Sequence, residues 1–409
     1  MNKNRLLILA DDLTGALDSG VQISLKGARV VILTNQRVEF PEDTSIDAIV
    51  IDTETRHVSP ETAAETVTRL VHEAKKRGIN RIYKKTDSGL RGNVGSELAA
   101  VLSASGKDHL NFIPAYPAAD RKTIGGIQYV NGKPVAESIF ANDPINPITV
   151  SRVDEIIHLS SDVPVTVSFG KGQKKEGILV YDAETGDDLK RISEELSSQN
   201  DLDVTGGCAG FLEVYPMEIK NDHEASKQSF SSLGKKLIVL SGSVNQITHD
   251  QLKHAEEHGA FRVHVPMNRI LKNLWSDSEK EKFTDYLETE AADSQVIIVD
   301  TLGEYDEALV TTPDEIAHVI ASNMGQLARK LQETFPDRAL MIIGGDTLQG
   351  FIRNKGVQLL CPIKEIDPGL VLSFYKTEHG RNYLITKSGA FGTEDQLTRV
   401  VRWLEEHDG

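Results

Sequence analysis

The sequence predicts an α/β fold of two domains, each a largely parallel β-sheet flanked by helices. Two observations lead to this fold class. Short apolar runs are repeatedly followed by a loop rich in Gly, Ser, Thr and Asp and then by a segment of helical periodicity, the pattern of a parallel sheet covered by helices. The length of 409 residues also exceeds one typical domain of about 150 residues. The polar segment 216–236 is the best linker candidate, which places the domains at 1–225 and 235–409.

The N-terminal half opens with one such strand–loop–helix unit. Its strand is 6–9, its loop is 11–15, and apolar residues then recur every four positions from Leu17, as on one face of a helix. A second helix is expected to begin at Ser59-Pro60, because Ser is a good N-cap and Pro suits the first helical position. The other expected elements are strands at 49–51, 81–83, 163–169 and 178–180, a strand ending near 114, a hairpin at 127–135, and helices from 94 and at 187–198.

The C-terminal half restarts the same pattern after the linker. Strands are expected at 237–240, 295–299, 339–343 and 383–386. Thr248 and Gln251 have the spacing of a capping box, and an apolar face from Leu397 to Leu404 defines the last helix.

Composition excludes several classes of protein. Lys and Arg total 45 and Asp and Glu total 61, so the net charge is −16, which disfavours nucleic acid and anionic membrane surfaces as partners. Two cysteines, Cys208 and Cys361, cannot build a disulfide framework or a four-thiolate zinc site. No run approaches the roughly 20 apolar residues of a membrane helix. We therefore expect a cytoplasmic protein, and the sequence leaves a homodimer open.

Ligands of parallel α/β sheets bind beyond the carboxyl ends of the strands, so the loops there are the candidate sites. The loop 10–16 places Asp11 and Asp12 just before a helix, where a carboxylate can accept hydrogen bonds from a polyol, hold Mg²⁺ or act as a general base. The loop 84–93 gathers cations, hydroxyls and an acid at a helix start, which suits a small hydroxy acid. Arg56, after the strand 49–51, is a second candidate for binding an anion. The residues of interest in loop 84–93 are Lys85, Thr86, Asp87, Ser88 and Arg91.

Three small polar loops follow strands in the C-terminal half. They are 241–245, 344–347 and 387–392, each before a helix. Glycines there let backbone N–H groups approach phosphate oxygens, and the helix dipole favours their charge. Three such loops together indicate a nucleotide site.

Other motifs point elsewhere or are missing. No Walker A loop, Gly-x-Gly-x-x-Gly after a strand, or Gly-x-Ser-x-Gly elbow is present. His254 and His258 match a zinc-peptidase spacing, but they lie off the apolar face of their helix and have no evident third ligand, so a solvated helix face is expected. Asp300 and Glu304 fit either metal or ribose ligands or an unremarkable acidic loop.

Together these motifs resemble the four-carbon acid sugar kinase family, the ATP-dependent tetronate kinases, along essentially the whole chain. The N-terminal motifs are 10–16, 52–56, 85–93, 114–117 and 207–210, and the C-terminal motifs are 241–243, 344–347 and 387–392. Thr55, Gly89 and Ala390 stand where Ser, Thr and Gly are common in the family, and Gly89 is the departure expected to shift substrate preference.

The resemblance implies an ATP-dependent kinase that phosphorylates the terminal hydroxyl of a four-carbon sugar acid, with Mg²⁺, and with its active site in the cleft between the domains. The start of the chain is more similar to the threonate and erythronate kinases than to the 3-oxo-tetronate kinases, so D-threonate or D-erythronate is the expected substrate, with 3-oxo-tetronate or L-threonate as the alternative. The rivals are a non-catalytic sugar-acid and ATP sensor and a sugar kinase of the ribokinase type. Asp12 is our first choice of general base and Asp346 the second. The metal ligands are not assigned. The sugar acid is assigned to Asp12, Arg56, Lys85, Thr86, Asp87, Ser88 and Arg91, and ATP to Ser241, Gly242, Ser243, Gly344, Gly345, Asp346, Thr347, Lys387, Ser388 and Gly389.

Overall fold

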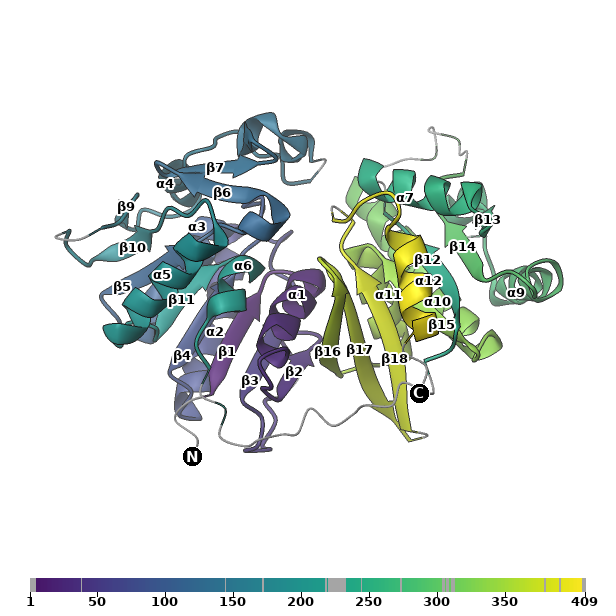
Figure 1. Cartoon of the computed structure of the whole chain (residues 1–409), viewed down its shortest axis with the longest axis horizontal. Helices are drawn as coiled ribbons and strands as arrows, with labels where there is room; N and C mark the ends of the chain where they lie inside the picture. The colour runs from purple at the N-terminus through teal and green to yellow at the C-terminus, as the bar shows by residue number, and fades with distance from the viewer. Residues whose placement is uncertain are drawn as a thin grey trace. The chain divides into compact units, whose positions relative to one another are not determined.

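The computed structural model forms two compact units, unit 1 at 1–224 and unit 2 at 225–409, coloured purple to teal and teal-green to yellow in Figure 1. The predicted linker 216–236 lies mostly outside the described residues. The structure describes residues 5–406 except 38, 144, 171–172, 218, 220–232, 244, 273, 304–305, 307–308, 310–312, 379 and 390.

Unit 1 is built on a parallel sheet in the order β2-β3-β1-β4-β11-β5-β10-β9. All of these neighbours pair in parallel, which confirms the α/β fold class for this half. The chain leaves β1 toward one edge and returns to β4 on its other side, so the order reverses beside β1. The strands are β1 (Leu6–Ala10), β2 (Val30–Leu33), β3 (Ala48–Asp52), β4 (Arg81–Lys85), β5 (His109–Ile113), β9 (Val165–Thr166), β10 (Gly177–Val180) and β11 (Val204–Gly207).

Helices cover both faces of this sheet (Figure 1). In a parallel sheet with right-handed crossovers, a helix that carries the chain toward one edge of the sheet and a helix that carries it toward the other edge lie on opposite faces. Accordingly α1, α5 and α6 pack along one face, whereas α2 and α3 pack together on the other. Ser59 caps α2 as predicted. The helices are α1 (Leu13–Ser24), α2 (Pro60–Lys76), α3 (Val94–Ser105), α4 (Val153–His158), α5 (Gly186–Ser198) and α6 (Ala209–Val214).

A small antiparallel sheet, β6-β7-β8, interrupts the parallel pattern. The predicted hairpin is confirmed: β7 and β8 pair across Asn131-Gly132, and both turn residues have positive φ. The predicted strand 163–169 is largely wrong, because only β9 pairs there and Ser168 has a left-handed backbone, φ 50°. The elements here are β6 (Arg121–Ile124), β7 (Ile127–Val130), β8 (Lys133–Pro134) and the 3₁₀ turns η1 (Pro117–Ala119), η2 (Val135–Glu137) and η3 (Ile139–Asn142).

Unit 2 contains a mixed sheet in the order β13-β14-β12-β15-β18-β17-β16. Its first five strands pair in parallel, but β17 is antiparallel to both β16 and β18. Strands β16 and β17 were not predicted from the sequence, because Pro362 and two register shifts break the alternation that marks a strand. The strands are β12 (Lys236–Ser241), β13 (Phe261–His264), β14 (Val296–Asp300), β15 (Arg338–Ile343), β16 (Leu359–Asp367), β17 (Leu370–Thr377) and β18 (Gly380–Lys387).

The helices of unit 2 also cover both faces of its sheet. Helix α10 packs with α8, α9 and α11, and α7 packs with α12. The predicted capping box is wrong: Asn245 caps α7, and the Thr248 hydroxyl instead donates to the Gly389 carbonyl at 3.0 Å. The helices are α7 (Gln246–Glu257), α8 (Met267–Leu271), α9 (Asp277–Glu290), α10 (Pro313–Thr334), α11 (Gly345–Lys355) and α12 (Gln396–Glu406).

The apolar strand residues make the cores. Strands β1 and β3 in unit 1 and the centres of β12 and β15 in unit 2 are buried along their length, as expected for strands covered on both faces. Among the helices that the structure describes, none has an apolar stretch of the length that a membrane crossing requires.

Candidate functional site

In unit 1 the loops that follow β1, β3 and β4 meet at the carboxyl edge of the sheet. Ala10, the last residue of β1, pairs with Asp52 on one side and with Lys85 on the other. The loops that begin after these residues therefore start side by side. This point is also where the strand order reverses, the usual place for a ligand in such sheets.

Arg56, from the loop after β3, links acids from the loops after β1 and β4. Its Nε donates to Asp11 at 2.7 Å, its Nη1 donates to Asp12 at 2.7 Å, and its Nη2 lies 3.7 Å from Asp87. Burial alone would lower the pKa of Arg56, but Asp11, Asp12 and Asp87 raise it well above its usual value. The guanidinium is a permanent cation, and we call it and its three acids the Arg56 cluster.

Asp12 is the most open acid of the Arg56 cluster. Its side chain is 22% exposed, against 2% for Asp11 and 10% for Asp87. It caps α1 by accepting a hydrogen bond from the Gly15 N–H at 2.8 Å, and the Thr14 hydroxyl donates to it at 2.6 Å. Although burial opposes ionisation, Arg56 and the nearby Lys85 hold the pKa of Asp12 below its usual value. Asp12 is thus an ionised acceptor that a ligand can reach.

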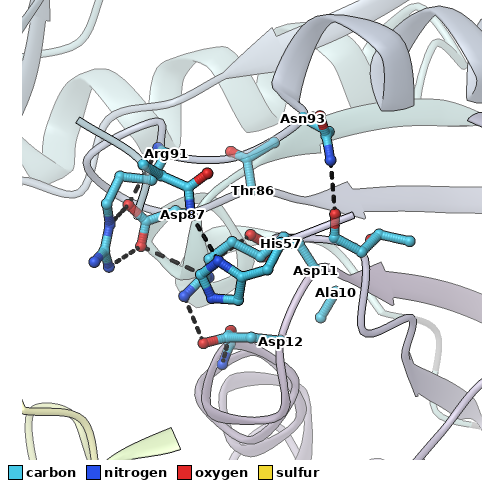
Figure 2. Close-up of polar contacts among 12 residues, drawn as sticks. Ala10, Asp11, Asp12, His57, Thr86, Asp87, Arg91 and Asn93 are labelled. Carbon is cyan, nitrogen blue, oxygen red and sulfur yellow. Dashed lines mark hydrogen bonds and ion pairs between the residues drawn. The ribbon is translucent and has the colours of Figure 1, made fainter. Parts of the chain in front are cut away.

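Asp87 and Arg91 form a closed pair. Two nitrogens of Arg91, Nε and Nη2, each donate to Asp87 at 2.9 Å, and Nη1 donates to Asp143 at 2.7 Å. The guanidinium also stacks on the Phe140 ring at 4.7 Å. Against the effect of burial, Arg91 and Arg56 hold the pKa of Asp87 far below its usual range. Figure 2 shows this pair across from Asp12. These three bonds use three of the five N–H donors of the guanidinium, so Arg91 orders the loop and keeps one N–H on each of Nη1 and Nη2 for a ligand.

Lys85 and Thr86 present polar groups that internal carboxylates do not occupy. The buried Lys85 Nζ donates to the Thr86 carbonyl at 2.6 Å, and no carboxylate among the described residues lies within ion-pair distance of it. The Thr86 Oγ1 is buried and has no hydrogen-bond partner within the described structure, and the same holds for Oδ1 of Asp11. Ser88 lies in the same loop, 9% exposed. A buried hydroxyl without a partner costs free energy unless a ligand or water satisfies it.

Several residues of the predicted loops support the site from beneath, and Lys84 is one of them rather than a cation open to a ligand. The fully buried Lys84 donates to the Leu9 carbonyl at 3.2 Å and lies 3.1 Å from Glu97, which in turn accepts the Thr55 hydroxyl. Asn93 donates to the Thr55 carbonyl at 2.8 Å. The sequence contains a signal for the different environments of Lys84 and Lys85. Side chains alternate along a strand, so these adjacent residues must point to opposite faces of the sheet.

Asp52, the first residue of the motif 52–56, was given no role from the sequence. It ends β3, is 1% exposed and accepts the Glu54 N–H at 3.0 Å. Burial, with Glu54 and Asp12 nearby, raises its pKa well above the usual value. A carboxyl group in this environment favours its neutral form.

In unit 2 the three predicted nucleotide loops also converge. The Gly242 N–H donates to Ile343 and the Gly344 N–H to Lys387, each at 3.2 Å, which ties the ends of β12, β15 and β18 together. A Cβ at position 389 would lie 2.6 Å from the Ser243 hydroxyl oxygen. The loops are therefore in close contact, and β12 and β15 flank the point where the strand order of this sheet reverses.

Each nucleotide loop contributes a distinct kind of group. Gly344, with φ 107°, caps α11, so Gly345 and the exposed Asp346 stand in its first turn, while Thr347 is buried against Gly242. Lys387 ends β18, and burial lowers its pKa to about 7. The Lys387 Nζ donates a hydrogen bond to the Ser388 carbonyl at 2.9 Å. A helix N-terminus, glycine backbone and a poorly solvated ammonium suit phosphate groups.

The alternative metal candidates are not supported. Asp300 is fully buried. One of its oxygens accepts a hydrogen bond from Arg262 Nε and the other pairs with His264 Nδ1, each at 2.7 Å. It is therefore not exposed as a ligand, and Glu304 lies outside the described residues. His254 and His258 stack with ring centroids 4.1 Å apart. Within the described residues no group of three or more His, Cys, Asp or Glu side chains is arranged to hold a metal ion.

Comparison with known proteins covers both units. A family model for a sugar-binding N-terminal domain matches residues 6–215, and one for a nucleotide-binding C-terminal domain matches residues 238–397. Among curated relatives, a D-threonate kinase of Salmonella typhimurium and a D-erythronate kinase of Heliobacterium modesticaldum are each 27% identical. These alignments cover 98% of this chain and 99% and 97% of the two relatives. A 3-oxo-tetronate kinase of Actinobacillus succinogenes is 25% identical over 95% of this chain and 97% of its own length.

Solved structures share the fold. A Salmonella typhimurium protein superposes with a TM-score of 0.76 at 23% identity, covering 98% of this chain and 99% of its own. A Haemophilus influenzae protein superposes with a TM-score of 0.70 at 21% identity, covering 98% and 100%. Because the sugar-binding model alone spans more than half of the sequence and the nucleotide-binding model most of the rest, the chain belongs to the four-carbon acid sugar kinase family.

Proposed function

We propose that this protein is an ATP-dependent kinase that transfers the γ-phosphoryl group of ATP to the terminal hydroxyl of a four-carbon sugar acid. D-threonate is the first candidate substrate and D-erythronate the second. The 3-oxo-tetronates and L-threonate are the alternatives.

One observation carries this proposal: curated tetronate kinases align with both units over 95–98% of the chain. The reaction needs a sugar-binding and a nucleotide-binding unit, and both units therefore have counterparts in the curated kinases. The chemistry of unit 1 agrees, since Lys85 offers a buried cation for a carboxylate and Thr86 an unpartnered hydroxyl for an alcohol. The preference for D-threonate rests on the relatives' names and on the motif 11–20.

We assign the sugar acid to the carboxyl edge of unit 1. Lys85, Thr86 and Ser88 hold its carboxylate and hydroxyls, while Arg56 and the Asp87–Arg91 pair fix the geometry of the loops. Asp12 accepts the proton of the attacking hydroxyl, because it is ionised and more exposed than the other two acids of the Arg56 cluster. The roles of these residues are part of the proposal.

We assign ATP to unit 2. The loops 241–243 and 344–347 and the segment 387–389 would surround its phosphates, with Lys387 as the cation and Asp346 as the alternative general base. Mg²⁺ remains part of this proposal; it would neutralise the charge of the phosphates, and its ligands would come mainly from them, since Asp346 is the one acid in these loops. The chain's own contribution is to position the phosphates.

The deciding experiment measures ADP release by the purified protein with Mg²⁺, ATP and D-threonate, D-erythronate, L-threonate or a 3-oxo-tetronate. We expect acid-dependent release with at least one of them, and the product should carry phosphate on its terminal carbon. Absence of turnover with all four would overturn the kinase proposal. Binding of both ligands without ADP release would instead identify a sensor.

A further inference from the structure

The carboxyl edge of unit 2 contains an ordered row of polar residues beside the nucleotide loops. Ser241, Asp300 and His264 end the adjacent strands β12, β14 and β13, and the strand register pairs Ser241 with Asp300 and Asp300 with His264. The row therefore extends from one nucleotide loop toward the outer strand of the sheet.

Asp300 fixes the orientation of His264. The carboxylate is fully buried; Arg262 Nε donates to one oxygen at 2.7 Å, and His264 Nδ1 lies 2.7 Å from the other, which also accepts the Leu302 N–H at 2.8 Å. Arg262 supplies a permanent positive charge beside Asp300, and it is shared with the half-exposed Glu256, which lies 2.9 Å from its Nη1. Asp300 therefore has a cationic partner besides the histidine.

The other side of the imidazole faces outward. A carboxylate only accepts hydrogen bonds, so Nδ1 carries the proton and Nε2 of the neutral ring is an acceptor. The His264 side chain is 45% exposed, and no residue in the described part of the chain bonds to Nε2. A ring whose tautomer is set by a buried acid is prepared to accept a hydrogen bond from a hydroxyl group.

The position of His264 matches the reach of a nucleotide. Neighbouring strands lie about 4.8 Å apart, so His264 stands on the order of 10 Å from Ser241 along the sheet edge. A nucleotide whose phosphates lie at the loops after β12 and β15 can extend across β14 toward the outer strand, as nucleotides do at such reversal points. The hydroxyl donors it offers there, next along the molecule after the phosphates, are those of its ribose.

We propose that His264 Nε2 accepts a hydrogen bond from a ribose hydroxyl of the nucleotide and that Asp300 is its positioning residue. This inference rests on the proposed use of ATP by unit 2. It assigns the selection of ribonucleotides over deoxyribonucleotides to the outer end of the sheet.

The test compares the binding of ATP, 2′-deoxy-ATP and 3′-deoxy-ATP to the full chain by calorimetry, without a sugar acid. For the wild type we expect one deoxynucleotide to bind roughly 3- to 12-fold more weakly than ATP, the value of one neutral hydrogen bond. In His264→Asn the amide can replace Nδ1 and keep the bond to Asp300, but no atom replaces Nε2. In His264→Gln the amide reaches the position of Nε2.

The two variants separate a ligand contact from a structural role. A ribose contact predicts that His264→Asn loses the discrimination and that His264→Gln keeps part of it; a purely structural role predicts full discrimination in His264→Asn. His258→Ala is the matched control, because this exposed histidine lies at the far end of α7, and it should match the wild type. Wild-type protein that binds all three nucleotides equally would overturn the inference but not the kinase proposal, whereas no ATP binding at all would overturn both.

Discussion

At the scale of single residues, Asp12 differs from its neighbours in being both ionised and accessible. We expect Asp12→Asn to lower kcat by roughly 10²- to 10⁴-fold, because an amide cannot accept the proton of the substrate hydroxyl. The Asn oxygen can still accept the Gly15 N–H, so α1 should keep its cap. Steady-state kinetics together with ATP calorimetry measure this, and ATP affinity should be unchanged.

The matched variant is Asp346→Asn, which changes the acid exposed in the first turn of α11. If this variant loses turnover while Asp12→Asn retains it, the general base is Asp346.

Lys387 should give ATP binding a pH dependence. Burial lowers its pKa to about 7, and phosphate placed beside it would raise that pKa again. Between pH 7 and the raised value, ATP binding must therefore take up a proton, and the Kd for ATP should increase as the pH rises from 7 to 9. Calorimetry at pH 8 in buffers that differ in ionisation enthalpy measures how many protons the protein takes up when ATP binds. Lys387→Met should bind ATP more weakly and abolish the uptake; equal uptake in this variant would remove Lys387 from the phosphate site.

At the scale of elements, η3 packs directly on the loop that follows β4. A Cβ at position 89 would lie 2.5 Å from Cδ2 of Phe140, the ring that supports Arg91. We expect Gly89→Ala to displace that ring, to cost about 1–3 kcal/mol of stability and to raise KM for the sugar acid while KM for ATP stays unchanged.

The double variant Gly89→Ala with Phe140→Leu provides the control, because the smaller side chain restores room. It should recover part of the sugar-acid KM. An unchanged KM in Gly89→Ala would show that η3 does not support the sugar side.

The elements also show how far sequence reasoning reaches. Strands such as β1 and β12 were predictable, because strands buried on both faces are continuous apolar runs. The convergence of Asp12, Arg56 and Asp87 followed from the rule that parallel strands end at one edge. The occupation of Arg91 by Asp143 was not predictable, since these residues lie 52 positions apart in loops without periodicity. The antiparallel pair β16–β17 was missed because its bulges hide the alternation.

At the scale of the whole molecule, two ligands should leave separate marks on the two units. Hydrogen exchange of the full chain should show protection of 12–15 and 86–90 by D-threonate and of 242–243 and 345–347 by ATP, because bound ligand suppresses local opening. Mass spectrometry of peptides from each unit reads this out. Protection of unit 2 segments by the sugar acid alone would contradict the assignment of the sugar acid to unit 1 and of ATP to unit 2. The placement of the active site in a cleft between domains stays a prediction.

The buried Lys84–Glu97 pair under the sugar-side loops has an evolutionary consequence. Replacing either partner alone leaves an uncompensated charge in the interior, which typically costs about 3–5 kcal/mol, whereas replacing both with apolar residues can be nearly neutral. Any path of single substitutions from this ion pair to an apolar pair therefore passes through a protein of lower stability. Across relatives, the two positions are expected to change together or not at all, so their correlated substitution would mark descent more durably than substitutions at exposed positions.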